Sequence, residues 1–180
     1  MGLFCLIFGS SALGYQSPRY VKMADEITER VAKQLKAEKN LCLAGTGGGM
    51  MNDIQMMAMS FYFYQEVDLK TARELMAYTI NKYLKEINSN KEIRPFLHEY
   101  PFTAKNVEIR IWIKPNGLNQ PLDKIYSISA IKGILTYYLD LPETYSRQAP
   151  CKETYEEASQ TIFLRNGNRP NHQEEYGSIK

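Results

Sequence analysis

The segment from Val107 to Lys114 constrains the fold more than any other, because apolar side chains occupy every second position in it. Val107, Ile109, Ile111 and Ile113 alternate with Glu108, Arg110, Trp112 and Lys114. A period of two is typical of a strand with one buried face and one face toward solvent. The sequence therefore predicts a sheet that is covered on one side only.

A second, longer strand is predicted from Ile54 to Glu66 by the same alternation. Its two faces are Met57, Met59, Phe61 and Phe63 on one side and Ala58, Ser60, Tyr62 and Tyr64 on the other. Two further strands, 124–131 and 134–139, flank Lys132-Gly133, a pair suited to a two-residue hairpin turn. With a short apolar run at 41–44, these segments give about five strands.

Two amphipathic helices accompany the strands. The first has apolar residues at Ala24, Ile27, Val31 and Leu35 and ends at Asn40, and the second follows Asp68, a candidate N-cap. The expected fold is α+β, a two-layer sandwich in the order helix-strand-strand-helix-strand-strand-strand, with an antiparallel sheet and both helices on one face. Profilin-like and roadblock-like domains share this order, an analogy of topology that confers no function.

Residues 1–14, MGLFCLIFGSSALG, read as an export signal. An apolar core is followed by small residues before Tyr15, although no Lys or Arg precedes the core. We expect an exported protein, periplasmic or extracellular, or a cytoplasmic one if the segment is retained. The run is too short for a membrane span, which needs about 20 apolar residues, so no transmembrane segment is expected in the mature chain.

Length and charge indicate one domain. The chain has 180 residues and a net charge of +2, too weak a positive charge for a dedicated nucleic-acid binder. We expect a linker at 15–19, a domain at 20–142 and a polar tail at 143–180 with a short helix at 152–164.

The stretch 93–106 is the most distinctive connection, because it places two prolines and three aromatic residues between a helix and a strand. Its pattern R-P-F-L-x-x-Y-P-F-T-x-K-N resembles a group of bacterial exported proteins, over about residues 54–140. The resemblance implies no activity. Arg94, Lys105 and Arg110 are candidate anion contacts, with pairing to Glu92 or Glu108 as the alternative.

Two sets of sulfur-containing residues are candidates for a disulfide and for a Cu(I) site. Cys42 and Cys151 remain as a pair once Cys5 is removed with the signal, so they either form a disulfide or stand as a buried and an exposed thiol. Met56, Met57 and Met59 offer thioethers for Cu(I) as a weak alternative, since on a strand they alternate between faces and core packing explains the same residues.

No motif for catalysis or for a bound cofactor was found. Gly45 to Gly49 is read as a flexible hairpin connection, with a ligand-touching loop as the alternative, since the lysine and the helix of a phosphate loop do not follow it. His98 and His172 form no zinc pattern, and no nucleophile elbow is present. The expectation is a protein that is not an enzyme and has neither metal nor cofactor.

The positive indication of function is an aromatic strand face, Tyr62 and Tyr64, with Trp112 and Tyr126 as expected neighbours. Such residues favour partner surfaces, whereas cover by the tail helix is the structural alternative. We expect a noncatalytic binding or interaction module of the cell envelope with a protein or small-molecule partner. The alternatives are a small-molecule sensor or cryptic enzyme with a pocket near Gly45 to Gly49, and a cytosolic roadblock-like or profilin-like scaffold.

Overall fold

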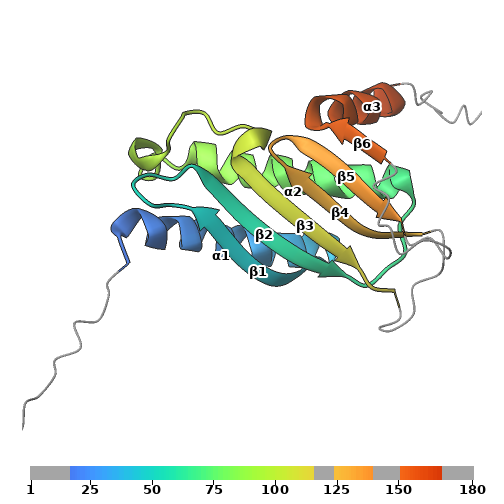
Figure 1. The fold of residues 1–180 in the computed structure, drawn as a ribbon, viewed down its shortest axis with the longest axis horizontal. Coiled ribbons are helices and arrows are strands. Elements are labelled where there is room, and N and C mark those ends of the chain that lie inside the picture. The colour runs from blue at the N-terminus through green and yellow to red at the C-terminus, as the bar shows by residue number, and fades with distance from the viewer. Residues whose placement is uncertain (1–16, 116–123, 140–150, 168–180) are drawn as a thin grey trace, which may run out of the picture.

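The computed structural model describes residues 17–115, 124–139 and 151–167, which form an α+β domain with three α-helices and a six-stranded mixed sheet (Figure 1). The elements in chain order are α1 (Arg19–Lys39), β1 (Cys42–Gly49), β2 (Met56–Phe63), α2 (Leu69–Ser89), the short 3₁₀ helices η1 (Arg94–Phe96) and η2 (Ala104–Asn106), β3 (Val107–Ile113), β4 (Ile125–Ile131), β5 (Ile134–Leu139), β6 (Cys151–Thr154) and α3 (Tyr155–Gly167). The expected signal segment lies outside the described residues.

Helix α2 begins after the predicted N-cap, and helix α1 ends at the predicted residue. The Asp68 side chain accepts a hydrogen bond from the Thr71 N–H at 2.7 Å, which satisfies a free donor in the first turn of α2. Asn40 ends α1 with a φ of 56°, a left-handed conformation that asparagine tolerates. Both helices cover one face of the sheet, called here the helix face (Figure 1).

The strands lie in the sheet in the order of the chain, β1-β2-β3-β4-β5-β6. Lys132 and Gly133 both have positive φ, 51° and 78°, and this tight turn makes β4 and β5 antiparallel, as predicted. The pairing of β2 with β3 is parallel. The prediction of a wholly antiparallel sheet was wrong here, because α2 carries the chain back along the sheet and β3 starts at the same end as β2.

The core lies between the helix face and the two long helices. The apolar residues of β2 and β3 that were predicted to be buried are at most 7% exposed, and they pack against Leu35, Met76 and Ile80. At the centre, the buried Tyr83 hydroxyl of α2 lies 2.6 Å from Oγ1 of Thr28 in α1. The helices therefore meet through a polar contact inside an apolar core.

The sheet continues beyond residue 142, where a polar tail was expected. β6 pairs with β5, and α3 packs against α2, where Ala158 is fully buried. Glu153 of β6 accepts hydrogen bonds from Arg73 Nε at 2.7 Å and from the Tyr137 hydroxyl at 2.6 Å. The expected short helix is present as α3, but it belongs to the domain.

The glycine-rich stretch is also a strand. Gly45 to Gly49 pair with Met56 to Ser60, so the flexible connection expected there was wrong. A bulge falls between Leu43 and Gly45. None of the helices within the described ranges is both long enough and apolar enough to cross a membrane.

Candidate functional site

The face of the sheet away from α1 and α2, called here the open face, carries a row of aromatic side chains. Cross-strand register places Tyr62, Trp112, Ser127 and Tyr138 side by side on β2, β3, β4 and β5. The ring centroids of Tyr62 and Trp112 are 5.5 Å apart, and those of Tyr126 and Tyr138 are 6.1 Å apart. These spacings are typical of aromatic contacts, so the rings form two contacting pairs, one on each side of Ser127 in the row.

A second row, parallel to the first, is polar and carries positive charge. In register across β2 to β6 it contains Ser60, Arg110, Ser129, Thr136 and Lys152. The exposed Arg110 guanidinium lies 6.0 Å from the Trp112 ring centre, and the Lys114 ammonium lies 4.3 Å from that of Tyr62. Cations and aromatic faces thus alternate on this surface, an arrangement suited to acidic groups of a ligand.

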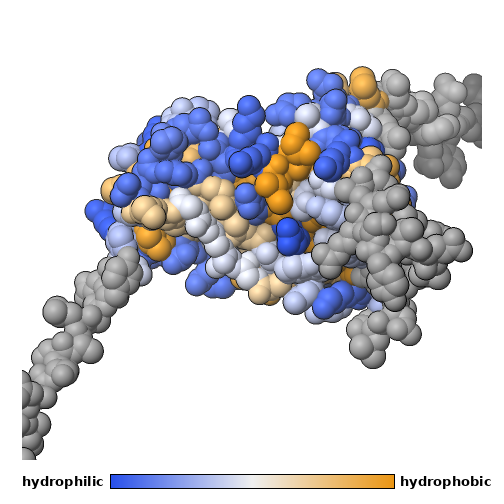
Figure 2. Space-filling model, viewed as in Figure 1, coloured by the Kyte–Doolittle hydropathy of each residue, from blue (hydrophilic) through white to orange (hydrophobic). Residues whose placement is uncertain are grey.

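A small hollow of about 200 Å³ lies between the two rows. Arg110, Trp112, Tyr126, Ser127 and Tyr138 line it. Figure 2 views the molecule from the open face and shows broad pale and tan areas of intermediate hydropathy beside blue, hydrophilic side chains. The surface is therefore suited to a ligand with both apolar and polar groups.

The four residues predicted to form a partner surface lie on the open face. Tyr62 contacts both Trp112 and Tyr64, and Tyr126 shares the hollow with Trp112. The tail helix does not cover them, because α3 packs on α2 at the helix face. That structural alternative was wrong.

Tyr138 was missed by sequence reasoning, although the signal was present. The turn at 132–133 pairs Ile131 with Ile134, and counting back along the hairpin sets Tyr138 opposite Ser127. Because Ser127 is opposite Trp112, Tyr138 must lie on the open face.

The three candidate anion contacts have separate surroundings. Arg94 stacks on Tyr100 at 4.2 Å and donates to the Asn88 carbonyl oxygen, whereas Lys105 lies beside Gly133. Among the described contacts none joins these two to Arg110. The alternative was pairing of these cations with Glu92 or Glu108. Among the described ion pairs, Glu92 pairs with Arg19 instead.

Neither alternative for the two cysteines is found as stated: they form no disulfide, and both are half-buried instead of one buried and one exposed. Cys42 and Cys151 are both free thiols, in β1 and β6 at opposite edges of the sheet. Neighbouring strands are about 4.8 Å apart, so five spacings separate the two edges by roughly 24 Å. Cys42 instead has its sulfur 3.0 Å from Lys36 Nζ.

The three methionines proposed for Cu(I) do not converge. Met57 and Met59 are buried in the core on the helix face, whereas Met56 lies on the open face. In the described part of the chain no cluster of His, Cys, Asp and Glu could hold a metal ion.

One pair of side chains has the chemistry of an acid–base dyad. His98 Nδ1 lies 2.6 Å from Asp53 Oδ2, and this contact raises the pKa of His98 and lowers that of Asp53. Among the hydrogen bonds of the described residues, none links this histidine to a serine, threonine or cysteine. The pair joins the loop before β2 to the loop after η1.

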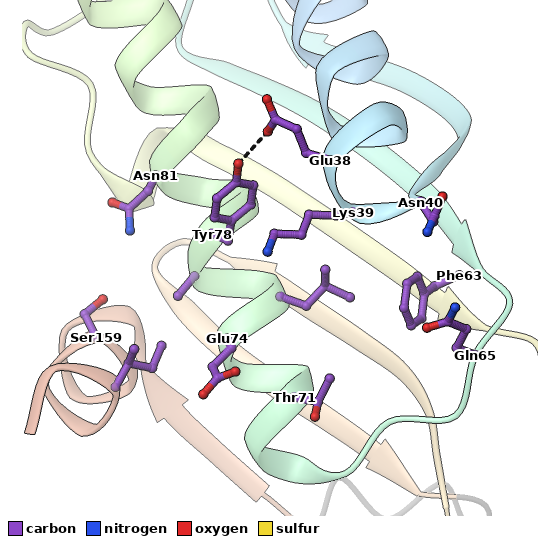
Figure 3. Close-up of a pocket in the computed structure, with 13 residues that line it drawn as sticks. Glu38, Lys39, Asn40, Phe63, Gln65, Thr71, Glu74, Tyr78, Asn81 and Ser159 are labelled. Carbon is purple, nitrogen blue, oxygen red and sulfur yellow. Dashed lines mark hydrogen bonds between the residues drawn. The ribbon is translucent and has the colours of Figure 1, made fainter. Parts of the chain in front are cut away.

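A larger hollow of about 820 Å³ lies at the other side of the molecule, between the end of α1, α2 and α3 (Figure 3). At its rim Glu38 accepts hydrogen bonds from Lys82 and from the Tyr78 hydroxyl, and both contacts hold the pKa of Glu38 below its ordinary value. The Ser159 hydroxyl on its far wall is buried and has no hydrogen-bond partner.

Comparison with protein-family models, with curated proteins and with solved structures finds no match to this chain. The two surfaces are therefore interpreted from their own geometry.

Proposed function

We propose that the protein is a noncatalytic binding module of the cell envelope, and that its open face binds an acidic segment of another protein. The observation that carries this proposal is the register of Tyr62, Trp112 and Tyr138 across neighbouring strands, with Arg110 in the adjacent row. Tyrosine, tryptophan and arginine dominate binding energy at protein interfaces. Export rests on the N-terminal segment of the sequence.

An acidic partner is favoured by the charges of the open face. The open face carries three cationic residues, Arg110, Lys114 and Lys152, and the acidic residue Glu108. Carboxylates of an extended segment can pair with these cations while its apolar side chains lie on the rings. The net charge of the whole chain, +2, argues against a polyanion such as nucleic acid as the principal ligand.

The proposal is tested by photo-crosslinking in cells. A photoreactive phenylalanine analogue replaces Tyr64, which is 52% exposed at the end of the aromatic row, and the matched control carries it at the exposed Lys85 on α2. We expect one discrete adduct with another protein from position 64 and none from position 85. The adduct should disappear when Arg110→Ala and Trp112→Ala are added.

Three results would contradict the proposal. They are equal adducts at the two positions, no adduct at position 64, and an adduct with the mass of two copies of this chain. Mass spectrometry of cell fractions tests export separately, because a removed signal leaves a mature chain that starts near Tyr15.

A second candidate, small-molecule binding, is favoured by the hollow in Figure 3, in place of the pocket expected near Gly45 to Gly49. Its volume of about 820 Å³ is within the range of ligand sites, and the unpartnered Ser159 hydroxyl would gain a hydrogen bond. A metabolite mixture added to the labelled protein should shift the NMR signals of Tyr78 and Asn81 and leave those of Tyr62 unchanged. No shift at Tyr78 and Asn81 would exclude this candidate for that mixture.

A further inference from the structure

The two edges of the sheet differ in how they are protected. β6 has four residues and carries Lys152 and Glu153, whereas β1 has eight residues and neither charged side chains nor proline. Natural sheets protect their edges with short strands, charges, prolines or bulges, because an open edge pairs with other chains. β1 has one such device, the bulge after Leu43, and its inner six residues are exposed.

The faces of β1 are uncovered over part of its length. A Cβ added at Gly45 would meet no atom within 4 Å, whereas one at Gly48 would meet the Met50 Cε at 2.5 Å. Within the described residues β1 has β2 as its one strand neighbour. Another strand could therefore pair with its outer side through main-chain hydrogen bonds.

The charged side chains of helix α1 indicate which strand could pair with β1. The Lys36 ammonium contacts the Cys42 sulfur, so this side of α1 faces the β1 edge. Glu29 and Asp25 lie on the same side of the helix, two and three turns earlier respectively, and Lys33 lies close to it. All four charged side chains are exposed. Between residues 25 and 36 the β1 side of α1 is thus acidic and then basic, whereas Lys22, one turn before Asp25, departs from this order.

This charge order is self-complementary. Two copies related by a two-fold axis across β1 would place their α1 helices antiparallel beneath the joined edge. Asp25 and Glu29 of one copy would then face Lys36 and Lys33 of the other. Both charge pairings place the two-fold axis near the same point of α1. A single arrangement of the two copies therefore allows both pairings.

We propose that β1 pairs antiparallel with β1 of a second copy, which makes one continuous sheet through a two-fold dimer. The assembly closes at two copies, because the other described edge, β6, is short and charged. This interface is independent of the proposed function and leaves the open face of both copies free. A dimer would present two open faces, and so bind a partner with repeated acidic segments more tightly than one copy does.

The test is sedimentation of the purified chain over a range of concentrations, combined with charge reversals on α1. We expect a dimer whose dissociation constant rises roughly tenfold in Lys33→Glu/Lys36→Glu and in Asp25→Lys/Glu29→Lys, since each reversal turns attractive contacts into repulsive ones. The four substitutions together should restore the dimer. The matched control, Lys85→Glu/Lys91→Glu on exposed positions elsewhere, should leave it unchanged.

Hydrogen–deuterium exchange reports on the strand itself. The amides of 42–49 should exchange more slowly as the protein concentration rises, while those of 151–154 do not change. A monomer at every concentration would overturn the proposal, as would a dimer that the fourfold charge swap fails to restore. Neither result would bear on crosslinking from the open face.

Discussion

At the scale of the residue, the contact between Tyr83 and Thr28 shows how a polar group is held in this core. The Tyr83 side chain is fully buried, and burial raises the pKa of its hydroxyl well above the ordinary value of 10.0. The Thr28 hydroxyl donates to the Ala24 carbonyl oxygen at 2.7 Å, so Tyr83 must donate to Thr28. Both hydroxyls are satisfied inside the apolar layer between α1 and α2.

Tyr83→Phe should therefore destabilise the protein by about 1 kcal/mol, because Thr28 loses a donor that water cannot replace. The free energy of unfolding is measured by urea denaturation. Tyr64→Phe, at an exposed position, serves as the control and should change it by less than about 0.5 kcal/mol. An equal effect of the two substitutions would contradict the role given to the buried hydrogen bond.

The contact of His98 with Asp53 predicts a pH-dependent link between two loops. The pKa of His98 is raised above 6.5 by its hydrogen bond to Asp53, so its contribution to stability is full below pH 6.5 and is lost as pH rises through the raised pKa. The pKa of Asp53 is lowered from 3.8, so its contribution is lost as pH falls through that lower value. An NMR titration of His98 should give a pKa above 6.5 that returns toward 6.5 in Asp53→Asn. An unchanged pKa in that variant would contradict the link.

At the scale of the element, a largely buried ion pair links β6 to α2, in addition to the pairing of β6 with β5 and the packing of α3 on α2. The side chains of Arg73 and Glu153 are 11% and 13% exposed, and Tyr137 donates to the same carboxylate oxygen. The contact raises the pKa of Arg73 and keeps it charged, while burial raises the pKa of Tyr137. Removal of Glu153 would leave Arg73 buried without a partner.

Glu153→Ala should cost about 3 kcal/mol of stability, the range for breaking a buried ion pair. The amides of 151–167 should exchange faster than those of β2 and β3 in the same variant. Glu156→Ala, on the exposed side of α3, is the matched control and should leave exchange unchanged. A uniform rise in exchange over the whole domain would show that β6 and α3 do not open separately.

The elements that sequence reasoning predicted are those whose side chains carry a period or a turn signal. The alternation in 107–113 and the Lys132-Gly133 turn specify β3 and the β4–β5 hairpin. β1 was missed in its second half, because four glycines have no side chains to alternate. β6 is too short for a period to appear.

The same reasoning found most of the open face but not its full extent. Alternation assigns Tyr62 and Trp112 to one side of their strands, yet it does not say which strands are neighbours. The parallel pairing of β2 with β3, which brings these two rings together, depends on the path of α2 through space. Tyr138 belongs to the site because the β4–β5 register, which the hairpin turn sets, places it opposite Ser127.

At the scale of the whole molecule, the sheet keeps its two described cysteines apart. Cys42 and Cys151 are at opposite edges, roughly 24 Å from each other by strand spacing. Both thiols should therefore react with an alkylating reagent after denaturation without reductant, even in protein taken from an oxidising compartment. Mass spectrometry counts the labels, and a chain in which these two cysteines are joined would contradict the strand order.

That strand order also bears on how the chain is made. Every strand from β2 onward pairs with the strand synthesised just before it, and the β2–β3 connection contains the long helix α2. The sheet can grow vectorially as the ribosome releases the chain, without any strand being inserted between two that are already paired. Until β6 emerges, the nascent chain leaves the edge of β5 bare, so the last strand protects one edge of the sheet, whereas β1 is an edge strand from the start.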